Sequence, residues 1–179
     1  MSPSNMETAL FQLVNRARTH PWEYPPHGDP TGASGVDPGL GHNPIVNAFE
    51  RCHAFGFSQQ LSDTARDHSV YMQGQSKDFV STGDNMHRGP DGKLVWDSGE
   101  PMDQAGYHRW RSENVALGFE TPEEVVIFWM QDDAPYGWRH RNAILARRFL
   151  VGDDVREAGI GYYEGGPWRH YWTLDMGKK

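Results

Sequence analysis

The chain has 179 residues, a length typical of one domain, and a formal net charge of −7. It has no long Lys/Arg run, which argues against a nucleic-acid-binding protein, because phosphate binding relies on clustered positive charge. Cys52 is the only cysteine, so an internal disulfide and a Cys-rich metal site are both excluded. The first residues lack the basic start and apolar run of a signal peptide, and no stretch approaches the roughly 18 apolar residues of a membrane helix.

Helical periodicity is clearest near the N-terminus. Apolar residues recur at three- and four-residue spacing from Met6 to Ala17, which predicts a helix over 6–18. Residues 19–44 are rich in proline and glycine and are expected to form a long loop, of the kind that is usually functional or mobile. A short helix is expected over 45–52.

Two further helices are expected over 61–73 and 121–131. The first has apolar residues at 61, 65 and 72 with charged residues opposite them. The second begins with Thr121-Pro122-Glu123-Glu124, where Thr is the N-cap, Pro the first helical residue and Glu124 the third, which is a capping box.

The C-terminal region is typical of an antiparallel hairpin. Strand-forming residues from 158 to 163 and from 168 to 174 flank a connection that contains Gly165 and Gly166, so the hairpin is expected within 157–175. Helices followed by a terminal hairpin favour an α+β fold over alternating βαβ units. The pair Gly159 and Gly161 lies in this strand context and lacks the rest of a dinucleotide fingerprint.

The familiar enzyme signatures are absent, including H-E-x-x-H, G-x-S-x-G and the Walker loop. What remains in the second half is a set of histidines and acids with metal-binding or hydrogen-bonding chemistry. The set comprises His87, Glu113, Asp132, Asp133 and His140. Each of them taken alone is more often a surface residue or a satisfied core residue than a functional one.

Ordered motifs along the chain add to this evidence. They are Leu13-Val14-Asn15-Arg16-Ala17-Arg18, Ala65-Arg66-Asp67-His68-Ser69 with Met72, His87-Arg88-Gly89-Pro90-Asp91-Gly92, Ala105-Gly106-Tyr107 leading to Glu113-Asn114-Val115-Ala116, then Trp129, His140-Arg141-Asn142-Ala143-Ile144-Leu145, and Gly159-Ile160-Gly161 with Tyr171 to Gly177. In this order they resemble the bacterial members of the CAP superfamily, the cysteine-rich secretory proteins, antigen 5 and pathogenesis-related 1 proteins. The resemblance covers most of the chain.

That resemblance implies a single domain over 1–179, folded as a three-layer α-β-α sandwich with a small antiparallel sheet. It also implies a cleft with two histidines and two acids, for which this chain offers His87, Glu113 and His140 at the matching motifs. The second acid is expected at Asp132, three residues after Trp129, in preference to Asp133. Relatives of this kind are secreted or periplasmic, and the same setting is expected here.

Two chemical interpretations of such a cleft remain. His87 and His140, with Glu113 and Asp132, can bind Zn²⁺ or another divalent cation, because imidazole nitrogens and carboxylate oxygens suit these ions. The same groups can instead form a buried hydrogen-bonded network. We expect any metal to bind weakly, since the ligands lie on separate elements and no thiolate is present.

Two functions follow from these interpretations. The first is a binding module for a small molecule, a lipid such as a sterol, or a cell-surface ligand. The alternative is a metal-dependent, peptidase-like hydrolase that uses the same cleft. Lipid and sterol binding enters only through the resemblance.

Other residues receive structural roles. His68 lies on the apolar side of its helix, and Asn114 has a side-chain amide suited to satisfying backbone groups. We expect Trp129, Tyr171 and Trp172 in the core. The tryptophans and tyrosine in expected loops are candidates for an exposed aromatic surface: Trp22, Tyr24, Trp96, Trp110 and Trp138.

Overall fold

The computed structural model describes residues 2–27, 51–145 and 156–179. The main helices of the described part are α1 (Asn5–Thr19), α2 (Gln59–Gln73), α5 (Pro122–Met130) and α6 (Arg139–Leu145). Shorter helical segments are η1 (Pro21–Glu23), α3 (Lys77–Val80), η2 (Gly83–His87), α4 (Pro101–Gln104) and η3 (Ala134–Tyr136). The strands are β1 (Gly56–Phe57), β2 (Trp110–Leu117), β3 (Glu157–Gly165) and β4 (Arg169–Lys178).

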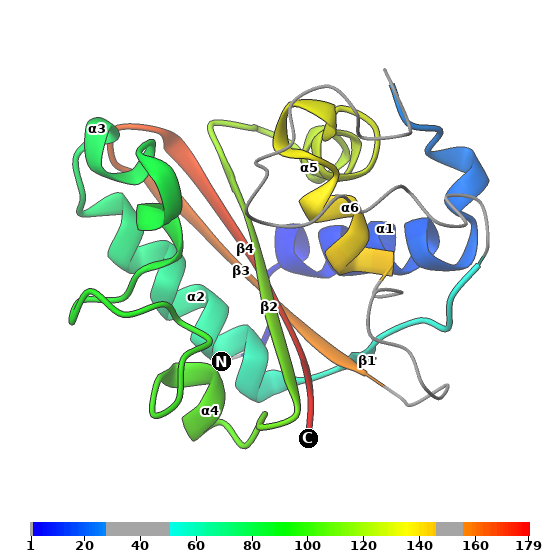
Figure 1. Cartoon of the computed structure of the whole chain (residues 1–179). Helices are drawn as coiled ribbons and strands as arrows, with labels where there is room; N and C mark the ends of the chain where they lie inside the picture. Colours follow the sequence, from blue (N-terminus) through cyan, green and yellow to red (C-terminus); the bar gives the residue numbers. More distant parts are fainter. Residues whose placement is uncertain (1, 28–50, 146–155) are drawn as a thin grey trace.

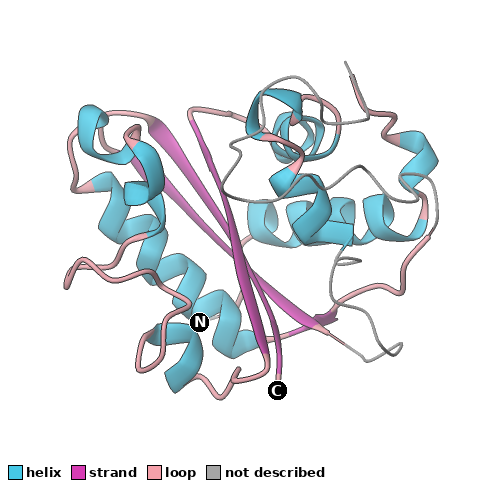
Figure 2. Ribbon diagram, viewed as in Figure 1, coloured by secondary structure: helices cyan, strands magenta, loops and turns pink. Residues whose placement is uncertain are grey.

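The chain folds into helical layers on both sides of one four-stranded sheet. Strand order is β1-β3-β4-β2, so β2 forms one edge of the sheet. Figure 1 shows α2, α3 and α4 on one side of the sheet and α1, α5 and α6 on the other, and Figure 2 shows the strands crossing between these two groups. The expected α+β class and the helix-sheet-helix layering are confirmed.

The expected C-terminal hairpin is also confirmed. Strands β3 and β4 pair antiparallel, with Glu157 opposite Gly177 and Gly165 opposite Arg169. The turn contains Gly166 at φ +63°, a backbone conformation that glycine adopts without a steric penalty. The sheet is mixed rather than purely antiparallel, because the two residues of β1 pair parallel with β3.

The three predicted helices form close to the expected bounds, and side chains cap their starts. At α1, the Ser4 hydroxyl accepts a hydrogen bond from the Glu7 amide while the Glu7 carboxylate accepts one from the Ser4 amide. Thr121 and Glu124 make the same reciprocal pair at α5. These capping boxes satisfy amides that a helix start otherwise leaves without partners.

The two faces of the hairpin differ in chemistry. On β4, Trp172 and Leu174 pack into the hydrophobic cluster shared with α1 and α5. Their neighbours on the other face, Thr173 and Asp175, contact α2 through Ser69 and Thr64. The α2-facing layer therefore combines buried polar contacts with two small apolar clusters, whereas the opposite layer holds one large apolar cluster.

Glycines allow α2 to lie directly on this polar face. A Cβ added to Gly159 would lie 2.0 Å from the amide nitrogen of Ser62, and one added to Gly161 would lie 2.2 Å from the carbonyl carbon of Ala65. The glycine pair of the sequence thus serves close packing between helix and strand.

The structure tests several expectations for aromatic residues. Trp129, Tyr171 and Trp172 are fully buried, as predicted. Trp22 is exposed, as expected, but Trp138 is fully buried, so its assignment to an exposed surface is wrong. Trp138 directly precedes α6 and has a φ of +61°. Most of the expected 19–44 loop and the expected 45–52 helix lie outside the described residues.

Candidate functional site

Strand β2 supports the candidate site with two neighbouring residues. Glu113 lies opposite Asp175 and Asn114 opposite Leu174, so their side chains project to opposite faces of the sheet. Both residues are buried. Adjacent positions on this edge strand therefore reach into the two helical layers.

On one face, Glu113 holds His87. Oε1 of Glu113 lies 2.7 Å from Nδ1 of His87, at the end of η2. A carboxylate only accepts hydrogen bonds, so the neutral imidazole carries its proton on Nδ1 and its lone pair on Nε2. The side chain of Glu113 is 0% exposed, that of His87 is 16% exposed, and the Trp96 ring lies 5.1 Å from the His87 ring.

His68 of α2 supports the segment that carries His87. Its Nε2 lies 2.8 Å from the carbonyl oxygen of Met86 and 3.7 Å from Oε1 of Glu113. Donation to the Met86 carbonyl ties η2 to α2 immediately before His87. This contact supports the structural role expected for His68.

On the opposite side, Asp133 holds His140. Oδ1 of Asp133 lies 2.6 Å from Nδ1 of His140, and Oδ2 accepts a hydrogen bond of 2.9 Å from the Arg141 amide. The side chain of Asp133 is 0% exposed and that of His140 is 11% exposed. The rings of Phe128 and Tyr136 each lie 5.3 Å from the His140 ring.

The expected position of the second acid is corrected from Asp132 to Asp133. The Asp132 side chain is 52% exposed and lies 2.9 Å from Nδ1 of His27, away from His140. Helical spacing from Trp129 fails here because α5 ends at Met130. Both aspartates follow the helix end, where the chain turns into η3, and the turn directs Asp133 inward.

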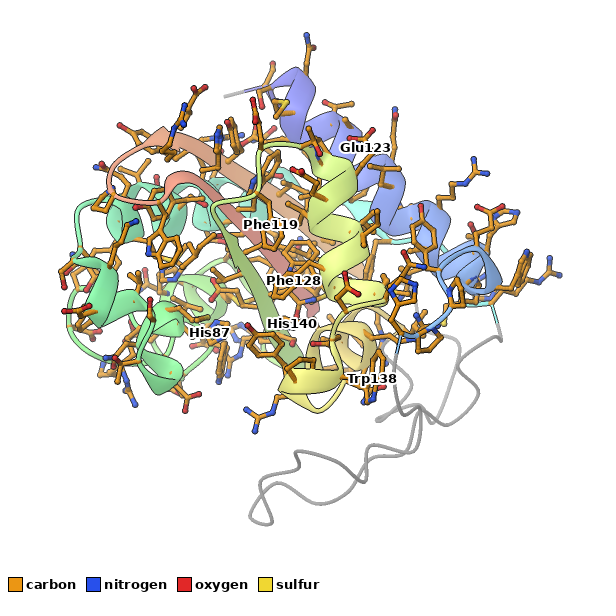
Figure 3. All side chains as sticks on the ribbon, turned by 90° about the horizontal axis from the view of Figure 1, so that it is seen from above. His87, Phe119, Glu123, Phe128, Trp138 and His140 are labelled. Carbon is orange, nitrogen blue, oxygen red and sulfur yellow. The ribbon has the colours of Figure 1, made fainter. Side chains whose placement is uncertain are left out.

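Asn114 links the second histidine to β2. Its side-chain amide donates a hydrogen bond of 3.1 Å to the carbonyl oxygen of His140. Adjacent strand residues thus hold His87 by its ring and His140 by its backbone. Figure 3 shows His87 arriving from the segment on one side of β2 and His140 from α6 on the other.

Arg141 fixes the start of α6 from inside the protein. Its guanidinium donates to the carbonyl oxygens of Tyr24 and Met130 at 2.7 and 2.5 Å. Burial lowers the pKa of Arg141 to about 10, and the Asp133 carboxylate opposes that shift. Sequence reasoning did not assign this role, although Arg141 follows His140 in the motif that identified the site.

The arrangement consists of two histidine–carboxylate pairs. In the part of the chain that the structure describes, no three side chains from His, Cys, Asp and Glu gather as a ready metal site. Glu113 and Asp133 are instead occupied as partners of imidazole Nδ1 atoms. Within these two pairs, the Nε2 atoms of the histidines are left as the groups for a ligand, and metal binding stays a prediction.

Among the described residues, no helix is long and apolar enough to cross a membrane.

Comparison with known proteins gives one family match. The sequence model of the cysteine-rich secretory protein family matches residues 11–176. Among solved structures, a cysteine-rich secretory protein from Staphylococcus aureus aligns with a TM-score of 0.49 and 16% sequence identity. The alignment covers 98% of this chain but only 39% of that protein. No curated protein matches this chain.

Proposed function

Because the chain belongs to the cysteine-rich secretory protein family, we propose that it is a ligand-binding domain whose cleft takes up a divalent cation such as Zn²⁺ through His87 and His140. By the cleft we mean the proposed binding site at the β2 edge, which these two histidines would flank. A secreted or periplasmic setting is part of the proposal.

The pairing of each imidazole Nδ1 with a buried carboxylate carries this proposal. Metal-binding histidines almost always donate their other ring N–H to a carboxylate, a carbonyl group or water, which sets the tautomer and ring orientation. Both histidines have this support, and both retain a partly exposed side chain. The Nε2 atoms of the two histidines are therefore the groups through which the proposed cation would be held.

Such a site would bind weakly and leave room for a further ligand. Two imidazoles fill half of the tetrahedral shell that Zn²⁺ prefers, so exogenous groups would complete it. Trp96 lies beside His87, and Phe128 and Tyr136 lie beside His140. These rings would offer apolar contact to an organic ligand, including the lipid or sterol class.

The open coordination positions also favour the alternative of a metal-dependent hydrolase. A bound zinc ion supplies activated water and polarises a carbonyl group. In that case the protein's own contribution is to hold both imidazoles through Glu113 and Asp133. Turnover of a peptide or ester substrate distinguishes this alternative from binding alone.

The test is calorimetric titration of chelator-treated protein with Zn²⁺ at pH 7.5 and 5.5. We expect binding at pH 7.5 that weakens at pH 5.5, because protons compete for the imidazole nitrogens. His87→Ala and His140→Ala should each abolish it. Asp133→Asn should weaken it by about 10- to 100-fold, the usual effect of losing a residue that supports a ligand.

His108 offers a matched control. Its Nδ1 atom also pairs with a carboxylate, that of Asp103 at 2.9 Å, but its side chain is 67% exposed and His108 is not part of the proposed site. His108→Ala should leave the titration unchanged. Binding that survives both cleft substitutions, or no binding at all, would contradict the proposal. Chelator-sensitive hydrolysis that disappears in His140→Ala would favour the hydrolase.

A further inference from the structure

A second buried carboxylic acid lies behind the Glu113–His87 pair. Asp175 is the cross-strand partner of Glu113, so both side chains project to the same face of the sheet. Asp175 is 1% exposed, and the Glu113 side chain is 0% exposed. The sequence motifs included Asp175 without giving it a role.

Each carboxyl group has one oxygen bonded and one without a donor. Glu113 Oε1 meets His87, while Asp175 Oδ2 accepts a hydrogen bond of 2.6 Å from the Thr64 hydroxyl. Their other oxygens, Glu113 Oε2 and Asp175 Oδ1, are buried, and no hydrogen-bond donor reaches them among the described residues. Two ionised carboxylates packed in this way would repel each other and leave two buried acceptors unsatisfied.

We propose that Asp175 is protonated at neutral pH and donates a hydrogen bond from Oδ1 to Oε2 of Glu113, which makes it a positioning residue for the Glu113–His87 pair. One proton satisfies both orphaned oxygens and leaves a single negative charge on the pair. The proposal holds whether or not the cleft binds a cation.

The neighbours decide which acid keeps the proton. Oε1 of Glu113 lies 2.7 Å from Nδ1 of His87 and 3.7 Å from Nε2 of His68, so two ring nitrogens border this carboxyl group. Asp175 receives only the hydroxyl of Thr64.

In the part of the chain that the structure describes, no cationic side chain is paired with Asp175. Gly159, opposite it on β3, has no side chain. On β2, Arg111 is bonded to Asp103. No Lys or Arg of the described residues forms an ion pair with Asp175 or Glu113. Burial first, and then the Glu113 carboxylate, raise the pKa of Asp175 well above its usual range, while the hydrogen bond from Thr64 opposes them in part.

The direct test is a ¹³C NMR titration of protein labelled at the aspartate side-chain carboxyl carbon. At pH 7 one aspartate signal should remain at the chemical shift of a protonated acid, and it should be missing from Asp175→Asn. If every aspartate signal of the wild-type protein is at the ionised position at pH 7, the proposal is overturned. A protonated signal that persists in Asp175→Asn overturns it as well.

Stability provides a second measurement. Unfolded aspartate loses its proton above about pH 4, whereas folded Asp175 keeps it, so this group stabilises the fold less as pH rises. The unfolding equilibrium constant of the wild type, relative to that of Asp175→Asn, should rise about tenfold per pH unit between pH 5 and 7. The asparagine amide retains a donor toward Glu113, so this variant should fold.

Asp91→Asn is the control with the opposite shift. Bonds from the Lys93 amide and the Lys93 side chain lower the pKa of Asp91, so Asp91 is ionised in both the folded and the unfolded state above pH 5. The unfolding equilibrium constant of the wild type, relative to that of Asp91→Asn, should stay constant between pH 5 and 7. A flat ratio for Asp175→Asn too would overturn the proposal.

Discussion

Replacing Gly161 with alanine tests how α2 is seated on the sheet. The new Cβ would lie 2.2 Å from both the carbonyl carbon of Ala65 and the amide nitrogen of Arg66. Ordinary contacts between such atoms are about 3.5–4.0 Å, so α2 would have to retreat by at least about 1.3 Å. Backbone atoms cannot relieve this clash by changing rotamer, and α2 carries the fully buried Leu61 and Met72.

The expected cost is at the upper end of overpacking, about 3 kcal/mol. Alanine also lowers the conformational entropy of the unfolded chain, which offsets about 0.4–1 kcal/mol of this cost. The free energy of unfolding should therefore fall by at least about 2 kcal/mol. For a chain of this size the melting temperature should fall by about 4–8 °C. Urea denaturation followed by tryptophan fluorescence measures the loss directly.

Gly56→Ala is the matched control, because its Cβ would make only ordinary contacts at 3.7 Å and beyond. This variant should stay within about 0.5 kcal/mol of the wild type. Equal stability of Gly161→Ala and Gly56→Ala would refute the argument that glycine is required for α2 to approach β3.

We expect Asp133→Ala to lower the free energy of unfolding by about 2–4 kcal/mol in chemical denaturation, because the two buried carboxylate oxygens of Asp133 accept hydrogen bonds from His140 and from a backbone amide. The neighbouring surface variant Asp132→Ala should change the free energy of unfolding by less than about 0.5 kcal/mol. A larger loss for Asp132→Ala than for Asp133→Ala would contradict the placement of Asp133 beside His140. Burial tends to raise the pKa of Glu7, but hydrogen bonds from Arg66 and Ser4 outweigh it and lower the net value. The stability from Glu7 is therefore present above about pH 4.5 and lost as pH falls, so acid unfolding of Glu7→Gln should show a shallower pH dependence than the wild type.

Buried polar residues on β2 explain why this strand was not predicted from the sequence. Residues 110–117 read WRSENVAL, without the apolar alternation of a half-buried strand. Glu113 is nevertheless buried, because His87 and the proposed proton of Asp175 satisfy it. A strand whose buried face is polar lacks the pattern by which strands are recognised.

The second acid was misplaced for a related reason. Asp132 and Asp133 differ in sequence position by one residue, and both would lie near the face of Trp129 if the helix continued. The helix stops at Met130, so the geometry of the following turn decides which carboxylate points inward. Local spacing describes a helix only within its own bounds.

The sequence alone determined the features that depend on neighbours along the chain. Helical periodicity predicted α1 and α2, a capping box predicted the start of α5, the glycine-containing turn predicted the hairpin, and ordered motifs gave His87, Glu113 and His140 as candidate site residues. Only the tertiary structure decided which groups meet. The pairing of Asp133 with His140, the burial of Trp138 and the register that sets Asp175 against Glu113 depend on turns and cross-strand contacts. Periodicity shows which residues share a face, but polar partners distant in sequence are selected when whole layers pack together.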